Sequence, residues 1–200
     1  MPKHSAGNKD MKKPYKIILA SHSPRRKELL AGLGYPFEIR VLKDIDESYP
    51  AELPANEVAL YIAQKKASAY RQSIASDELV ITADTVVIVG NEILGKPVDQ
   101  PDAIRMLHQL SGRTHQVTTG VCLLTTTTER CFDVTTEVTF KHLTDEEILH
   151  YVTQYKPYDK AGAYGIQEWI GYIGVTGLHG SYYNVMGLPV QRIYQELSKI

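Results

Sequence analysis

Apolar and polar residues follow two different periods along the chain, and each period predicts a different kind of element. The apolar run Tyr15–Ala20 predicts a buried strand. Beyond it, Ser23 and Pro24 are typical of the cap and the first residue of a helix, whose leucines recur on one face until Gly34. The chain is therefore expected to run from a strand directly into a helix.

The same two patterns continue to the end of the chain. Helical spacing is found over Pro54–Gln72, from about Pro101 to Leu110, in "TDEEILHYVTQY", and after the turn in "NVMGLPVQRIYQELSK". The segment Glu78–Pro97 is predicted to hold two strands separated by a short break at Ala83–Thr85. Two more strands are expected in "HQVTTGVCLLT" and "CFDVTTEVTFKHL", the second of which alternates like a half-buried antiparallel strand. This irregular alternation predicts an α/β or α+β fold with a mixed sheet.

Composition narrows the classes of protein that fit. The chain has 200 residues, of which 43% are apolar, enough for a core in one large domain or two small lobes. A formal net charge of -1 argues against a dedicated nucleic-acid binder. No apolar run approaches ~18 residues, so we expect no membrane span. Residues 1–14 are polar and lysine-rich, and we predict a disordered tail there and a single domain over residues 15–200.

The two cysteines, Cys122 and Cys131, are nine residues apart. Two thiols at this spacing do not make a metal site by themselves, and no secretory signal indicates a compartment in which disulfides form. The histidines show no zinc-ligand spacing with a cysteine. We therefore expect reduced thiols in a cytoplasmic protein.

The segment "SHSPRR" has the composition of a phosphate-binding site. The N-terminus of a helix presents unpaired N–H groups and the positive end of the helix dipole. Ser21 can add a hydroxyl donor, and Arg25 and Arg26 add planar groups that each bind phosphate through two N–H groups. The alternative is a capped helix with a basic first turn, which is less favourable because cations oppose the dipole there.

Other polar residues are candidates for the same site, although each has an ordinary alternative. Asp84 lies with Thr85 between two apolar stretches, where a carboxylate is either part of a capped turn or a functional acid. Lys96 follows a glycine in a rigid turn and Lys66 lies on a predicted helix, so either could be a surface lysine. Glu47 is a loop acid or a metal ligand. Together, the cations and the acids suggest a polyphosphate substrate with a divalent metal.

Five motifs, "LASHSPRR", "ADTVV", "GKP", "DKAGAYGIQ" and "YNVMGLP", occur in this order, and they resemble the Maf family of nucleoside triphosphate pyrophosphatases from about Tyr15 to Ser198. The resemblance implies an α/β fold with a mixed, curved sheet and a central cleft between two lobes, as in Maf and ITPase proteins. It also implies cleavage of nucleoside triphosphates to the monophosphate and pyrophosphate with a divalent cation, Mg²⁺ or Mn²⁺. Homodimers are expected on the same basis.

The resemblance further implies roles for individual residues. It places Ser21, Arg25 and Arg26 in the phosphate-binding loop, and Glu47, Lys66, Asp84, Lys96 and Gln167 at other polar positions of the cleft. Asp84 matches the proposed general base, but the sequence leaves open whether Asp84 and Glu47 act as base or as metal ligands. Arg25, Thr85 and Gln167 match positions that separate subfamilies and indicate the dTTP/UTP branch. The sister branch, which takes 7-methyl-GTP, differs at the arginine position and has a glutamate at the glutamine position.

A non-catalytic regulator of cell division that binds nucleotide or nucleic acid is the second hypothesis. The phosphate-binding cations would serve such a protein equally well. Asp84 would not, because a carboxylate in a cationic cleft repels the ligand unless a metal intervenes. The acid therefore favours an enzyme.

Overall fold

The structure is a computed structural model that describes residues 15–200, so the tail predicted at residues 1–14 lies outside the described residues. Its strands are β1 (Lys16–Leu19), β2 (Phe37–Ile39), β3 (Glu78–Val89), β4 (Glu92–Leu94), β5 (Thr114–Leu124), β6 (Glu129–Phe140) and β7 (Val175–His179). Its helices are α1 (Pro24–Gly32), α2 (Ala55–Tyr70), α3 (Gln100–Leu110), α4 (Asp145–Tyr155), α5 (Trp169–Gly174), α6 (Tyr182–Val185) and α7 (Val190–Leu197), with a 3-10 turn η1 (Ala161–Ala163). None of these helices is long and apolar enough to cross a lipid bilayer.

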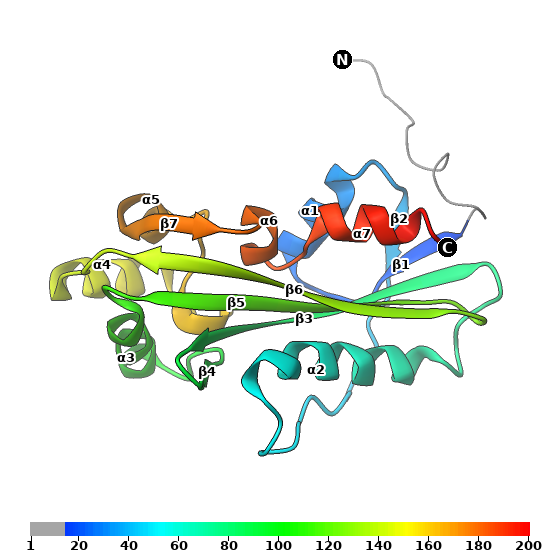
Figure 1. Cartoon of the computed structure of the whole chain (residues 1–200), viewed down its shortest axis with the longest axis horizontal. Helices are drawn as coiled ribbons and strands as arrows, with labels where there is room; N and C mark the ends of the chain where they lie inside the picture. The colour runs from blue at the N-terminus through cyan, green and yellow to red at the C-terminus, as the bar shows by residue number, and fades with distance from the viewer. Residues whose placement is uncertain (1–14) are drawn as a thin grey trace, which may run out of the picture.

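The described strands form one seven-stranded mixed sheet in the order β2-β1-β3-β5-β6-β7, with β4 paired to β3 beside this path. β1 is parallel to both β2 and β3, whereas the pairs β3–β5, β5–β6 and β6–β7 are antiparallel. Figure 1 shows α2 on one face of the sheet and α1 and α7 on the other. The predicted α/β fold with a mixed sheet and flanking helices is confirmed.

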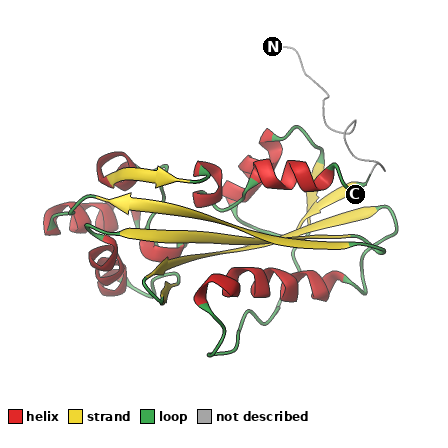
Figure 2. Cartoon of the chain, in the orientation of Figure 1, coloured by secondary structure: helices red, strands yellow, loops and turns green. Residues whose placement is uncertain are grey.

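The long strands β3, β5 and β6 join two groups of helices, as Figure 2 shows. At one end, α3 and α4 surround a buried cluster that includes Leu107, Phe140 and Tyr151. At the other end, α1 and α7 cover a second cluster that includes Leu30 and Ile193. The two lobes therefore share one sheet.

The strand β3 is left without a partner along part of one edge. β1 pairs with residues 78–81 and β4 with residues 87–89, whereas β5 pairs with residues 80–88 on the other edge. The predicted break at Ala83–Thr85 is therefore wrong, because continuous pairing with β5 holds β3 extended through its polar residues. The open edge between β1 and β4 places Asp84 and Thr85 between the two lobes.

The predicted cap of α1 is confirmed. The Ser23 hydroxyl accepts a hydrogen bond from the backbone N–H of Arg26 at 3.4 Å, which caps α1. Thr144 and Glu147 cap α4 with a reciprocal pair of hydrogen bonds, a capping box. The sequence pattern missed β2, β4, α5, α6 and β7, which have three to six residues and are too short to show a period.

The expectation of two reduced thiols is wrong. Cys122 of β5 and Cys131 of β6 lie directly opposite one another in the antiparallel register and form a disulfide. The turn Thr125–Thr128 makes β5 and β6 a hairpin, which brings these two residues face to face. Spacing rules for metal sites and secretion signals do not detect this kind of cross-strand pair.

Candidate active site

A cleft of about 600 Å³ lies at the open edge of β3, between the two lobes. All nine residues that the sequence singles out line it: Ser21, Arg25, Arg26, Glu47, Lys66, Asp84, Thr85, Lys96 and Gln167. They come from segments that extend from the β1–α1 connection to the loop after η1. The fold therefore brings together side chains that are distant in the sequence.

The N-terminus of α1 forms one wall of the cleft. Ser21 is buried, and its Oγ accepts a hydrogen bond from the N–H of Ser23 at 3.2 Å. Arg25 reaches across the cleft to the other lobe, where its guanidinium donates to Oδ2 of Asp159 at 3.0 Å. The phosphate-site composition predicted here thus lies at a helix N-terminus that faces a cationic cleft.

Arg26 compensates for the strand that β3 lacks. Its guanidinium donates to the carbonyl of Ala83 at 2.9 Å, to Oγ1 of Thr85 at 3.0 Å and to the carbonyl of Gly187 at 2.8 Å. Burial lowers the pKa of Arg26, and the nearby Asp84 opposes that effect. These contacts use three of the five N–H groups of the guanidinium, so at most two remain for an incoming phosphate.

Lys66 of α2 lies between two carboxylates. Its Nζ is 2.9 Å from Oδ1 of Asp84 and 3.1 Å from Oε1 of Glu47. One ammonium is thus shared by an acid from β3 and an acid from the loop before α2. Carboxylate oxygens are the ligands that hard divalent cations prefer. The two acids are therefore the candidate residues of this cleft for holding Mg²⁺ or Mn²⁺.

A third lysine, Lys160, also lines the cleft, and sequence reasoning gave it no role in the site. It is buried, and its Nζ contacts Oδ1 of Asp159 at 2.8 Å and Oε1 of Glu168 at 3.1 Å. Although burial raises the pKa of Asp159, hydrogen bonds from Lys160 and Arg25 hold it at about 2. The available signal was the motif "DKAGAYG", in which Gly165 lets the lysine stem approach closely.

Gln167 lies in the loop after η1 and has an unused acceptor. Its Oε1 is buried and has no hydrogen-bond partner among the described residues. Tyr164, in the same loop, also lines the cleft, and its hydroxyl shares a hydrogen bond of 2.7 Å with Nε2 of His115. An unpaired buried acceptor is unfavourable, so Oε1 of Gln167 is suited to receive a donor from a ligand.

Comparison with known proteins places this geometry in a family. The model of the family described as Maf-like protein matches residues 16–200. A dTTP/UTP pyrophosphatase from Phocaeicola vulgatus is 61% identical over 186 residues, covering 93% of this chain and 96% of that relative. Proteins of the same name from Porphyromonas gingivalis and Flavobacterium johnsoniae are 57% identical over 190 residues and 49% identical over 192 residues. These matches cover 94% and 96% of this chain, and 96% and 98% of the relatives.

A solved structure of a HAM1 protein from Coxiella burnetii is similar in fold. It is 14% identical and superposes with a TM-score of 0.50 over 93% of this chain and 100% of the other. This likeness concerns the fold alone. The match over residues 16–200 and the identities to the three relatives carry the assignment: the chain belongs to the family of Maf-like proteins.

Proposed function

We propose that this protein is a nucleoside triphosphate pyrophosphatase that hydrolyses dTTP and UTP to the monophosphate and pyrophosphate. The observation that carries the proposal is the single cleft that unites arginines, lysines and carboxylates from distant segments. Such cations bind a polyphosphate. The carboxylates favour an enzyme, because a protein that only binds anions has no use for acids that repel its ligand. The names of the relatives support the same substrates. The activity would remove these nucleotides, or modified pyrimidine triphosphates, from the nucleotide pool.

The cleft cations are suited to the charge that develops during this reaction. Water attacks the α-phosphorus and pyrophosphate leaves, so negative charge builds on the oxygen that departs with the β-phosphate. Preorganised cations stabilise that charge because they are in place before the reaction. We assign Arg25, Lys96 and the remaining N–H groups of Arg26 to the phosphates. Ser21 accepts a hydrogen bond from Ser23 and keeps its own proton for a phosphate oxygen.

We assign a divalent cation, Mg²⁺ or Mn²⁺, to Glu47 and Asp84. Both carboxylates contact the ammonium of Lys66. They therefore lie close enough to one another to share a bound cation. When bound, such a cation would offset the charge of the triphosphate and lower the pKa of water. Lys66 holds Oδ1 of Asp84, and we assign Oδ2 to accept the proton of the attacking water.

Gln167 is our candidate for recognition of the base. Uracil and thymine present an N3–H donor beside the O4 acceptor, and a carboxamide offers one acceptor and one donor group that match this edge. The unpaired Oε1 of Gln167 would accept from N3–H, while Nε2 donates to O4. Cytosine has no N3–H and carries an amine at position 4, so it fits less well. The 5-methyl group of thymine is small, so both pyrimidines should be accepted.

A panel of nucleoside triphosphates tests the proposal, with Mg²⁺ or Mn²⁺ present and pyrophosphate release as the measurement. dTTP and UTP should exceed CTP in kcat/KM by a factor equivalent to about 1–3 kcal/mol. ATP and GTP should be poor substrates because a pocket shaped for one ring excludes two. Equal cleavage of all the common triphosphates, or a preference for 7-methyl-GTP, would contradict the subfamily assignment from Arg25, Thr85 and Gln167.

Two variants complete that experiment. Gln167→Glu should erode the ranking, because an ionised carboxylate cannot donate to O4. Asp84→Asn is the control for the chemistry and should lower turnover by at least ~10²-fold, while its nearly isosteric side chain preserves the fold. A wild-type protein that binds dTTP without releasing pyrophosphate would instead be the non-catalytic nucleotide-binding regulator.

We further propose that residues 15–200 work as one domain in the cytoplasm, where nucleotide substrates are found, and that two copies pair as a homodimer. The family resemblance supports the dimer, and so do Leu178 and Tyr183, which are 38% and 52% exposed near the sheet edge β7. The near-neutral net charge supports a role that does not depend on nucleic acid.

A further inference from the structure

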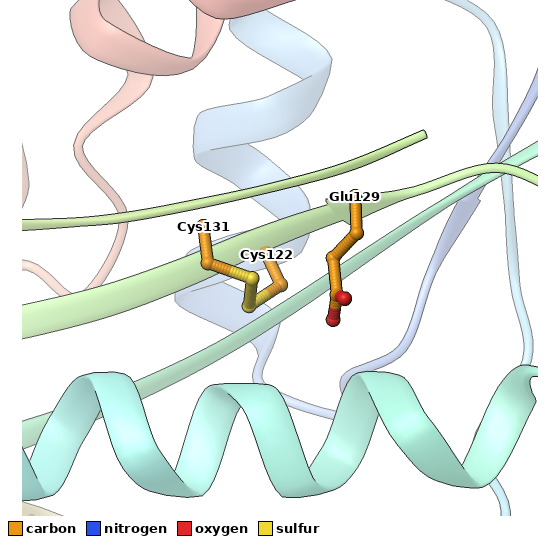
Figure 3. Close-up of side chains that lie close together, drawn as sticks. All are labelled: Cys122, Glu129 and Cys131. Carbon is orange, nitrogen blue, oxygen red and sulfur yellow. A yellow bond between two sulfur atoms is a disulfide. The ribbon is translucent and has the colours of Figure 1, made fainter. Parts of the chain in front are cut away.

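The disulfide between Cys122 and Cys131 lies outside the cleft and takes no part in the proposed reaction. Cys122 is fully buried, whereas Cys131 is partly exposed. A carboxylate oxygen of Glu129 lies within 4.8 Å of both sulfur atoms. Figure 3 shows these three side chains, with the sulfur atoms between the hairpin and a neighbouring helix, α2.

This bond joins two strands that the fold already holds together. β5 and β6 pair continuously from Thr114 opposite Thr139 to Leu124 opposite Glu129. A disulfide stabilises a protein mainly by restricting the unfolded chain, and the gain increases with the length of the loop that it closes. Here the two cysteines are nine residues apart in one hairpin. A purely structural role is therefore a weak explanation for the pair.

We propose that Cys122 and Cys131 form a reversible dithiol–disulfide site that exchanges with small thiols of the glutathione class, and that its oxidation state alters the packing beneath α2. Reversibility reconciles the observed bond with the cytoplasmic location proposed above, where small thiols keep most cysteines reduced. Cys131 is the more exposed of the two cysteines, so we assign its sulfur as the one that a small thiol attacks first.

The exchange is balanced in two steps. An external thiolate attacks the sulfur of Cys131, the bond between the two sulfur atoms breaks, and Cys122 leaves as a thiolate that takes up a proton. A second external thiolate attacks the external sulfur of the mixed disulfide, and Cys131 leaves and is protonated. Two electrons pass to the protein, and the small thiol becomes its own disulfide. Oxidation is the reverse.

The packing around Cys122 connects the pair to the cleft. Cys122 shares a buried cluster with Ala67 and Tyr70 of α2. Tyr70 also accepts a hydrogen bond from the N–H of Leu42 at 3.1 Å, in the segment that leads to the loop acids of the cleft. Lys66 is on the same helix. Two unbonded sulfur atoms need more room than a bonded pair, and a close-packed interior transmits such a change.

Labelling of free thiols in a series of glutathione buffers tests the exchange. After equilibration, the wild-type protein is denatured and labelled with a maleimide. It should carry two labels in excess reduced glutathione and none in excess glutathione disulfide, with a midpoint at an intermediate ratio. Cys131→Ser is the matched control: it keeps the thiol of Cys122, cannot form the bond, and should show no such midpoint. A pair that stays oxidised in excess reduced glutathione, or stays reduced in excess glutathione disulfide, would overturn the proposal.

Hydrogen exchange tests the link to α2. Amides of α2 should exchange faster in the reduced protein than in the oxidised one, whereas amides of α3, at the far end of the sheet, should not change. Equal exchange of α2 in both states would overturn the link. If the reduced protein instead bound zinc tightly, and the bound zinc prevented formation of the disulfide, Cys122, Glu129 and Cys131 would be a metal site and the proposal would be wrong. These measurements need no substrate, so they stand apart from the proposed function.

Discussion

Arg26 takes the place of a missing strand at the open edge of β3 and is also one of the residues that we assign to the phosphates. Its guanidinium donates to the carbonyl of Ala83, on the edge that neither β1 nor β4 reaches, and to Oγ1 of Thr85 on the same strand. Its third hydrogen bond, to the carbonyl of Gly187, ties this strand to the loop before α7. The Thr85 hydroxyl is also 2.9 Å from Oγ1 of Thr119 on β5. Thr85 was predicted at a position that separates subfamilies. In the structure its hydroxyl bridges Arg26 and Thr119 and so helps to position the guanidinium of Arg26.

Replacement of Arg26 by lysine should separate its charge from its geometry. Lysine keeps the charge but cannot make three directed hydrogen bonds. Because one hydrogen bond to a charged group contributes about 1.5–3 kcal/mol, Arg26→Lys should lower kcat/KM at least ~10-fold and also lower Tm. Arg25→Lys is the matched control and should lose less stability, since Arg25 makes one contact with an exposed partner. If Arg26→Ala lowers only Tm and leaves the kinetics intact, the alternative is correct, and "SHSPRR" is an ordinary capped helix start with a basic first turn.

The sequence predicted the contents of the cleft well, because ordered motifs identify residues without any knowledge of distances. It did not predict their mutual contacts. Lys66 is 18 positions before Asp84, and Arg25 is 134 positions before Asp159. Sequence reasoning assigned Lys160 no role, because a single lysine in a small-residue loop is recognised as part of a site only from the acids that surround it in space. Contacts between charged residues that are distant in the sequence follow from tertiary packing, so no local sequence pattern predicts them.

At the scale of elements, the packing of α2 against the sheet determines where Lys66 lies. α2 lies directly against β5 at Gly120, where an added Cβ would lie 2.4 Å from the carbonyl oxygen of Ala59 and the backbone of Leu60. Only a residue without a side chain permits this contact. The buried face of the helix, including Val58 and Ile62, then covers the sheet.

Gly120→Ala should therefore lift α2 from β5. We expect the free energy of unfolding to fall by about 1–3 kcal/mol or more, since overpacking against backbone has no flexible side chain to absorb it. Turnover should fall as well, because Lys66 moves with the helix. Urea denaturation and kinetics measure both effects. Gly177→Ala is the control, since its added Cβ would meet Thr139 at an ordinary 3.5 Å. Equal stability of the two variants would show that the close approach at Gly120 is not needed.

Long elements were predictable, whereas the continuity of β3 was not. The helix predicted at Pro54–Gln72 differs by one or two residues from the observed Ala55–Tyr70, because apolar spacing and end signals agree there. The polar pair Asp84 and Thr85 suggested a break, whereas the strand continues because β5 pairs with it throughout. Strand pairing is a long-range property, and so is the gap between β1 and β4 that opens the cleft.

At the scale of the whole molecule, one buried imidazole links the long strands to the cleft wall. His115 is 2% exposed on β5, and its ring packs edge-on against Phe140 of β6 and Tyr164. Burial lowers the pKa of His115 to about 4. The ring is therefore neutral at neutral pH and holds the Tyr164 hydroxyl through Nε2.

This burial makes stability depend on pH in a defined direction. In the unfolded chain His115 has an ordinary pKa of about 6.5, so between that value and about 4 the unfolded state binds a proton that the folded state refuses. The free energy of unfolding should therefore fall as pH falls through this window, by up to about 3 kcal/mol from this residue. His115→Gln keeps a polar partner for Tyr164 without the titration, so its stability should change less over the same range, even if it is lower at neutral pH. Urea denaturation of both proteins at several pH values measures the difference. Parallel profiles for the two proteins would show that another group causes the acid sensitivity and that His115 is not the buried neutral base of this fold.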